Sequence, residues 1–136
     1  MVDRLREFTP DAGNMLSNPV DSNRVWWSPP DFIKTVKMID RWEGADLMLF
    51  HIPAPDGIPT SQQRMDHYQK SINGVLDSKG IISKPLAAVV LYGRQVEMAR
   101  RSVQAQQELT GAGIPVYHTV ERAANAISKF MDYHGK

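Results

Sequence analysis

Short apolar segments alternate with longer segments of helical periodicity along most of this chain, and that alternation limits the folds open to it. The segments 46–52, 86–92 and 114–118 read as strands, because they are short, apolar and bounded by glycine, proline or polar residues. One more strand is expected at 19–22. The first two of these strands lack regular alternation of apolar and polar residues, which predicts that the sheet is covered on both faces.

Four helices are predicted between and after these strands. Ser28, Thr60 and Thr119 are the expected N-caps, and Gln63 completes a capping box with Thr60. The third helix is expected over 95–110. The side chains expected to face the core are Phe32, Val36 and Ile39; Met65, Tyr68, Ile72 and Val75; Val96, Ala99 and Val103; and Ala123, Ile127 and Phe130.

Strands that alternate with helices imply right-handed crossovers and a parallel sheet. The predicted fold class is therefore α/β: a three-layer, mainly parallel, doubly wound sheet of about four to five strands, of flavodoxin type. A length of 136 residues suits one domain. We expect an irregular N-terminal segment over 1–17 and a single domain over 18–136.

Composition excludes several classes of protein and site. The net charge of +1 gives no reason to expect nucleic-acid or membrane binding, and no apolar run approaches the ~20 residues needed to cross a bilayer. The absence of cysteine excludes disulfides, thiolate metal sites and a cysteine nucleophile. No histidine pair has metal-ligand spacing, so no metal site is expected. We predict a cytoplasmic location.

Ligands of such sheets collect beyond the carboxyl ends of the strands, where helices begin with unpaired N–H groups that attract anions. Here the loops at these ends cover 51–60, 92–95 and 118–119. The residues predicted to face a phosphoryl group or another anion are His51, Asp56, Gly57, Thr60, Ser61, Gly93, Arg94 and Thr119.

Each of these candidates also has a purely structural interpretation. His51 and His118 could be packed, hydrogen-bonded histidines at strand ends, and Arg94 could be a solvated loop residue. Trp26 and Trp27 could stack on a ligand, form a docking patch for another domain, or place one ring in the core. The docking interpretation is slightly favoured, because two adjacent large rings are hard to bury in a loop.

Several nucleotide-binding and signalling classes lack their required residues. There is no GxGxxG after the first strand and no GxxxxGK[ST] motif. The strand ends carry His51, Tyr92 and His118 rather than the acids and lysine of a response-regulator receiver. The segment "VDSNRVWWSPP" is a poor substitute for the Ser/Thr-rich phosphate loop of a flavodoxin.

Three stretches together resemble one family. With the sequence between them, they cover nearly the whole chain from about Gly13. "GNMLSNPVD" resembles a GNPVD-type opening, "SKPLAAVVL" resembles a KPVVVV strand, and "LTGAGIPVYHTVERAANAISKFMDY" resembles a GIPVY strand followed by a T-x-ERA-x-x-A helix. These patterns are similar to the second flavodoxin-like domain of the NDP-forming acyl-CoA synthetases, which include ADP-forming acetate–CoA ligase and have the succinyl-CoA synthetases as relatives.

The resemblance implies a part in converting acyl-CoA, ADP and phosphate into acid, CoA and ATP through a phosphohistidine. CoA, ATP or ADP, and Mg would be bound by partner CoA-binding and ATP-grasp domains, and none of them by this domain alone. The family's catalytic histidine lies in a GHAG or SHTG context, which no histidine of this chain shares. The chain is thus expected to be inactive in isolation, with no catalytic residue of its own identified.

The resemblance further implies that the helix starting near Thr60 offers its N-terminus to the phosphohistidine loop of a neighbouring domain. Prolines in "PAPDGIPTSQQ" would fix this loop before the anion arrives. The relatives have a Gly-Gly turn here, and Asp56 would repel a phosphate unless it points away, so the domain could instead serve as a docking wall.

Two other functions stay open. One is a non-catalytic protein-binding or oligomerisation module of the same fold, with Trp26 and Trp27 in its interface. The other is a carrier of flavin or another small ligand, which purified yellow protein would reveal. The sequence leaves the acyl group, the choice of ADP or GDP and the existence of a homo-oligomer undetermined.

Overall fold

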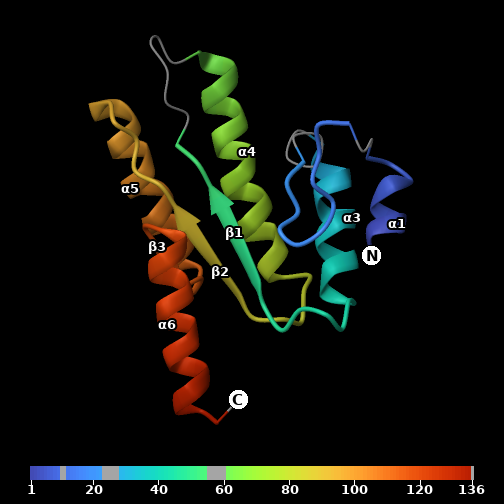
Figure 1. Ribbon diagram of the computed structural model, residues 1–136. Coiled ribbons are helices and arrows are strands. Elements are labelled where there is room, and N and C mark those ends of the chain that lie inside the picture. The colour runs from blue at the N-terminus through green and yellow to red at the C-terminus, as the bar shows by residue number, and fades with distance from the viewer. Residues whose placement is uncertain (10–11, 23–27, 55–60, 136) are drawn as a thin grey trace.

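The computed structural model describes residues 1–9, 12–22, 28–54 and 61–135. Helices and strands alternate from residue 29 onward (Figure 1). In order they are α1 Val2–Arg6, α3 Pro29–Asp40, β1 Met48–Ile52, α4 Gln62–Lys79, β2 Leu86–Val90, α5 Val96–Gly111, β3 Val116–Tyr117 and α6 Val120–Tyr133.

The described strands form one parallel sheet in the order β1-β2-β3. The α/β class and the parallel sheet are thereby confirmed, but the sheet has three described strands and not the expected four to five. The strand expected at 19–22 does not join it. Asp21 instead pairs antiparallel with Met15 through two backbone hydrogen bonds of 2.7 and 2.8 Å, so this piece closes on its own loop.

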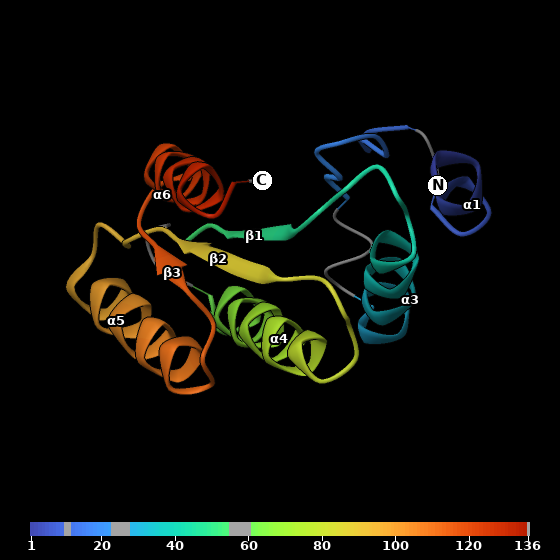
Figure 2. The same ribbon diagram turned by 90° about the horizontal axis from the view of Figure 1, so that it is seen from below.

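Helices lie on both faces of the sheet, as Figure 2 shows: α4 and α5 on one face and α6 on the other. The core lies between the strands β1 and β2 on one side and the helices α4 and α5 on the other. Alternate residues of β1 pack there against α4, and the rings of Phe32 and Phe50 lie 5.9 Å apart. Four of the five residues of β2 are buried, which identifies it as the central strand.

The prediction that β1 is covered on both faces is wrong. Met48, Phe50 and Ile52 are buried, whereas Leu49 is half-buried and His51 is exposed. Successive side chains of a strand point to opposite faces, and α6 packs on β2 and β3. The face of β1 that carries Leu49 and His51 therefore lacks the cover that α4 gives to the other face.

The cap of α3 is confirmed, and that of α4 lies one residue later than expected. Ser28 Oγ accepts the Asp31 N–H at 3.4 Å, and two of the three predicted core residues, Phe32 and Val36, are buried. In α4, Ser61 has extended backbone and accepts the Arg64 N–H at 3.3 Å, so this residue, and not Thr60, is the N-cap. The expected stripe of α4 is largely correct, with Tyr68, Ile72 and Val75 buried.

The expected inner face of α5 is wrong. Val96 is 72% exposed and Val103 41% exposed, while Met98, Ser102, Ala105 and Leu109 are buried. The buried stripe was hard to recognise because it contains a polar residue, Ser102. Its hydroxyl is satisfied by backbone groups, as described below.

The prediction for α6 is correct at its start and wrong at its end. Thr119 is the N-cap, its Oγ1 accepting the Arg122 N–H at 3.1 Å, and Ala123 is buried. Ile127 is half-buried, but Phe130 is 65% exposed. The physical reason is that β3 is short and the second half of α6 runs past the edge of the sheet (Figure 1).

A polar clamp joins the end of α3 to the start of β2. The Asp40 carboxylate accepts the backbone N–H groups of Ser83 (3.0 Å) and Lys84 (2.9 Å), and Lys84 Nζ donates to the carbonyls of Ile39, Asp40 and Trp42. The Lys84 N–H bond, helped by Ser83, lowers the pKa of Asp40 below its usual value. The clamp thus satisfies carbonyls at the C-terminus of α3.

Candidate functional site

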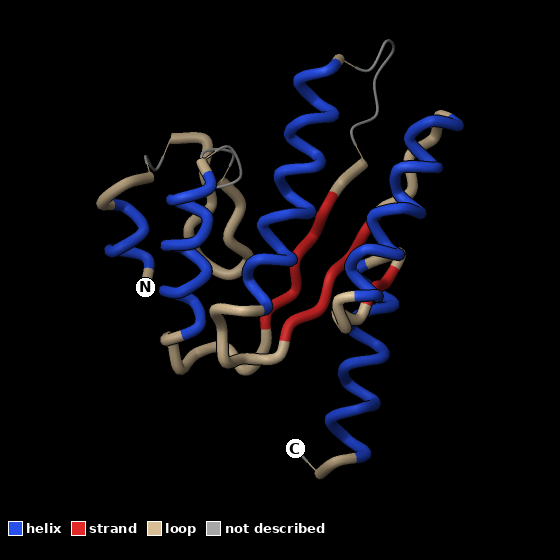
Figure 3. The backbone as a smooth tube through the Cα atoms, turned by 180° about the vertical axis from the view of Figure 1, so that it is seen from behind, coloured by secondary structure: helices blue, strands red, loops and turns tan. Residues whose placement is uncertain are grey.

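The carboxyl ends of the three strands lie at the same edge of the sheet, because the strands are parallel (Figure 3). We call this edge the strand-end rim; it comprises 52–54, 61–64, 91–95 and 118–120 among the described residues. Predicted residues His51, Ser61, Gly93, Arg94 and Thr119 lie on or beside it. Asp56, Gly57, Thr60, Trp26 and Trp27 lie outside the described residues.

The loop between β2 and α5 is fixed by Ser102. Its Oγ accepts the buried Gly93 N–H at 3.2 Å and lies 2.8 Å from the Met98 carbonyl and 3.1 Å from the Leu91 carbonyl, to which it can donate. A Cβ on Gly93 would lie 2.1 Å from the Met98 Cβ, so only glycine fits. The Gly93 amide is already bonded within the protein, which makes it a poor donor to an anion.

The three helix openings on the strand-end rim differ in charge and capping. Ser61 and Thr119 each bond one amide of the first turn of α4 and α6, while α5 has no side-chain cap. Glu97 and Glu121 lie in the first turns of α5 and α6, where they favour the helix but repel an anion. The first turn of α4 contains no acid and includes Arg64, so α4 offers the most favourable opening to an anion.

A polar cluster between the ends of β2 and β3 contains one residue that the sequence did not indicate. The rings of Tyr92 and His118 have centroids 4.9 Å apart. Gln106 of α5 joins them, with Oε1 3.5 Å from the Tyr92 hydroxyl and Nε2 3.3 Å from His118 Nδ1. Tyr92 and His118 could be identified from the sequence because they lie at the ends of predicted strands. Nothing in the sequence indicates Gln106, which lies in the middle of a helix.

A groove of about 990 Å³ runs along β1 and reaches the strand-end rim. We call it the β1-edge groove; the residues that define it are Asn18–Ser22, Thr35, Leu49, His51, Tyr68 and Val120. His51, predicted to face a ligand crevice, lines it. Residues 19–22, which were expected to form a strand of the sheet, instead line this groove.

Burial shifts two titratable groups of α4 that line the β1-edge groove. It lowers the pKa of His67, and the nearby Lys70 charge acts in the same direction. It raises the pKa of the Tyr68 hydroxyl. Both groups are therefore held in their neutral forms around pH 7.

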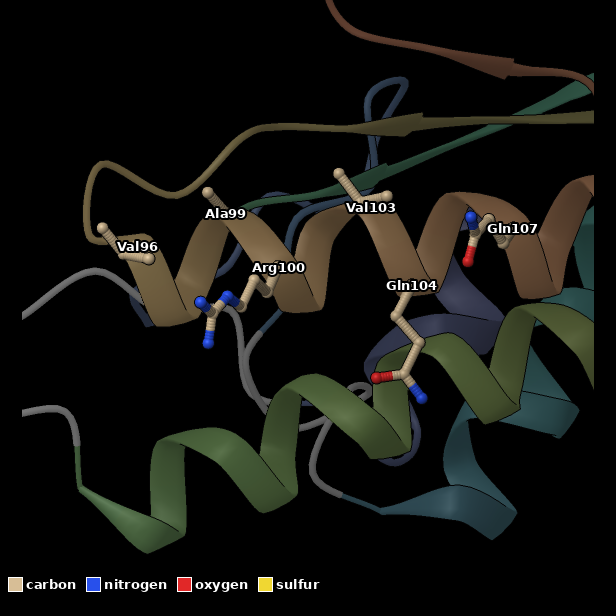
Figure 4. A pocket seen from close by; sticks show the side chains of 6 residues that line it. All are labelled: Val96, Ala99, Arg100, Val103, Gln104 and Gln107. Atoms are coloured by element: carbon tan, nitrogen blue, oxygen red, sulfur yellow. The ribbon is translucent and has the colours of Figure 1, made fainter.

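A second, shallower hollow of about 430 Å³ lies on the outer surface of α5 (Figure 4). All its lining residues come from that one helix: Val96, Ala99, Arg100, Val103, Gln104 and Gln107. A single helix face encloses little of a small ligand, so this hollow is better suited to contact with another protein.

Within the described ranges, no group of three acidic or histidine side chains is placed to hold a metal ion. No helix of those ranges is both long and apolar enough to cross a bilayer. No protein-family model, curated protein or solved structure matches the chain. The structure thus establishes an α/β fold with a parallel three-stranded sheet flanked by helices.

Proposed function

We propose that this chain is a non-catalytic domain of an NDP-forming acyl-CoA synthetase, with a flavodoxin-like fold of the succinyl-CoA synthetase type. Its task is to present the α4 N-terminus to a phosphohistidine loop and to provide docking surface for CoA-binding and ATP-grasp modules. CoA, nucleotide and Mg are then bound by those partners, and the isolated chain does not turn over.

The observation that carries this proposal is the opening of α4 on the strand-end rim. Its first turn holds a basic residue and no acid, unlike the first turns of α5 and α6. The Ser61 cap bonds the Arg64 amide, and among the described residues no side chain caps the amides of Gln62 and Gln63. Two such donors at a helix N-terminus suit a phosphoryl group. The sequence patterns described above supply the family.

The proposal is tested by removing one donor amide in the assembled enzyme. Gln62→Pro deletes the first N–H of α4 at a position where proline fits a helix. It also removes the 2.8 Å bond from Gln62 Nε2 to Asp66, so Gln62→Ala, which loses that bond but keeps the amide, is the matched control. We expect ATP formation to fall at least about tenfold in the proline variant relative to the alanine variant. Equal rates in the two variants would reject the phosphoryl cradle.

A second candidate function is a protein-binding or oligomerisation module without a catalytic role. The observation in its favour is the exposure of large apolar side chains on the outer helices, among them Val96 and Val103 of α5 and Val120, Phe130 and Tyr133 of α6. If the chain has this second function, it should associate with a partner protein, and the Gln62→Pro variant should associate with that partner as tightly as the original chain does.

A further inference from the structure

The outer edge of β1 carries main-chain groups that no described strand pairs. Met48 N–H donates to the Pro85 carbonyl at 2.9 Å, and the Ile52 carbonyl accepts the Leu91 N–H at 3.2 Å. Alternate residues of a parallel strand bond to the same neighbour. The N–H and C=O groups of Leu49 and His51 therefore point away from β2, into the β1-edge groove.

Two buried hydroxyls on the far side of this groove also lack hydrogen bonds within the described structure. Ser22 is 2% exposed and Thr35 of α3 is 3% exposed, and both line the groove. Leaving a buried hydroxyl unsatisfied is costly, so native proteins rarely do it without a reason. These two hydroxyls therefore mark a polar part of the groove wall.

The residues near the two ends of β1 differ in charge. Exposed Glu43 and Asp46 lie in the loop before β1, next in the sequence to the groove-lining residues Trp42, Ala45 and Leu47, and do not line the groove themselves. Arg64 lines the other end, next to the positive N-terminus of α4. A peptide parallel to β1 would place its amino end beside the acids and its carboxyl end beside α4, which gives both ends a complementary charge.

We propose that the β1-edge groove binds an extended segment of a partner polypeptide as a fourth parallel strand, basic at its amino end and acidic at its carboxyl end. Strand addition satisfies the main-chain groups of Leu49 and His51. A partner helix would not, because its own amides are already bonded. A second copy fits poorly, because α3 and residues 18–22 wall the outer side of each groove. This inference does not depend on the acyl-CoA synthetase assignment.

Amide hydrogen exchange followed by NMR tests the proposal, with the synthetic peptide KVTVTVE as the probe. In the free protein, the amides of Leu49 and His51 should exchange readily. At a peptide concentration about ten times its Kd, exchange of both should slow about tenfold. The charge-reversed peptide EVTVTVK should bind less tightly, and KVTVTVE methylated on alternate backbone nitrogens should give no protection.

A pair of variants tests the edge from the side of the protein. His51→Pro removes one outward N–H at an edge position that tolerates proline, and His51→Ala removes only the imidazole. KVTVTVE should bind the proline variant about tenfold more weakly than the alanine variant. Unchanged exchange of the amides bonded between β1 and β2 verifies that the sheet persists.

Four results would overturn the proposal. Protection of Leu49 and His51 in the free protein at all concentrations would show that the chain fills its own edge. Protection that appears only as protein concentration rises would assign the edge to a second copy. Failure of KVTVTVE to slow exchange of both amides, or equal protection by the methylated peptide, would show that the groove does not add a strand.

Discussion

At the scale of single residues, Ser102 is a polar side chain that stabilises the core and that helical periodicity did not identify as buried. It lies in the buried stripe of α5, where helical periodicity alone favours apolar residues. Its hydroxyl joins the loop after β2 to its own helix, accepting from Gly93 and lying within bonding distance of two carbonyls. The spacing of apolar residues could not predict this role, because the hydrogen-bond partners of Ser102 are backbone groups, which the sequence does not distinguish.

Replacing Ser102 with alanine should destabilise the protein by about 1–3 kcal/mol, since the Gly93 N–H would be buried without a partner. Ser78→Ala is the matched control. Ser78 is equally buried, but among the described residues its hydroxyl bonds just the Gly74 carbonyl of its own helix, so its loss should cost clearly less. Urea unfolding measures both free energies. Equal losses would contradict the role given to Ser102.

Stability should fall with acidity in two separate windows. The folded-state pKa of His67 lies below the ordinary 6.5, so the unfolded chain binds the proton first, and stability declines as pH falls below that value. The folded-state pKa of Asp40 lies below 3.8, so the stability from its clamp is present above that value and disappears as pH falls through the folded pKa. Unfolding free energies measured against pH test both windows. His67→Gln should flatten the first decline and leave the second, and a first decline that persists in this variant would contradict the assignment.

At the scale of elements, periodicity predicted where helices and strands lie better than which face they bury. The caps Ser28 and Thr119 were predictable because a side-chain oxygen at the start of an apolar stripe has a local physical role. The faces of α5 and α6 were not, because burial depends on where the sheet ends. Phe130 continues the apolar stripe of α6 but is largely exposed, in the half of this helix that runs past the sheet (Figure 1).

Phe130→Ser should leave stability within about 0.5 kcal/mol, because the side chain is largely exposed in the isolated chain. Leu109→Ala, at a fully buried position of α5, should lower the free energy of unfolding by about 2–5 kcal/mol. It is the comparison variant for a core position. If α6 docks a partner, Phe130→Ser should weaken that association in sedimentation experiments. A loss of stability approaching that of Leu109→Ala would mean that Phe130 is covered within the fold.

At the scale of the whole molecule, the alternation of strands and helices was sufficient to predict a parallel sheet with helices on both faces. The number of strands was not predictable, because residues 15–21 form a backbone pair within their own loop. No described strand pairs with the outer edge of β1, and the β1-edge groove lies along that edge. The strand-end rim follows from parallel topology alone, whereas the cluster of Tyr92, Gln106 and His118 depends on tertiary packing.

The most direct test of the proposed function measures ATP formation from acyl-CoA, ADP and phosphate by this chain, first alone and then mixed with the CoA-binding and ATP-grasp modules of an acyl-CoA synthetase from the same organism. We predict no turnover by the chain alone, and in the mixture a stable complex that forms ATP. Turnover by the chain alone, or modules that neither bind it nor depend on it for ATP formation, would contradict the proposal.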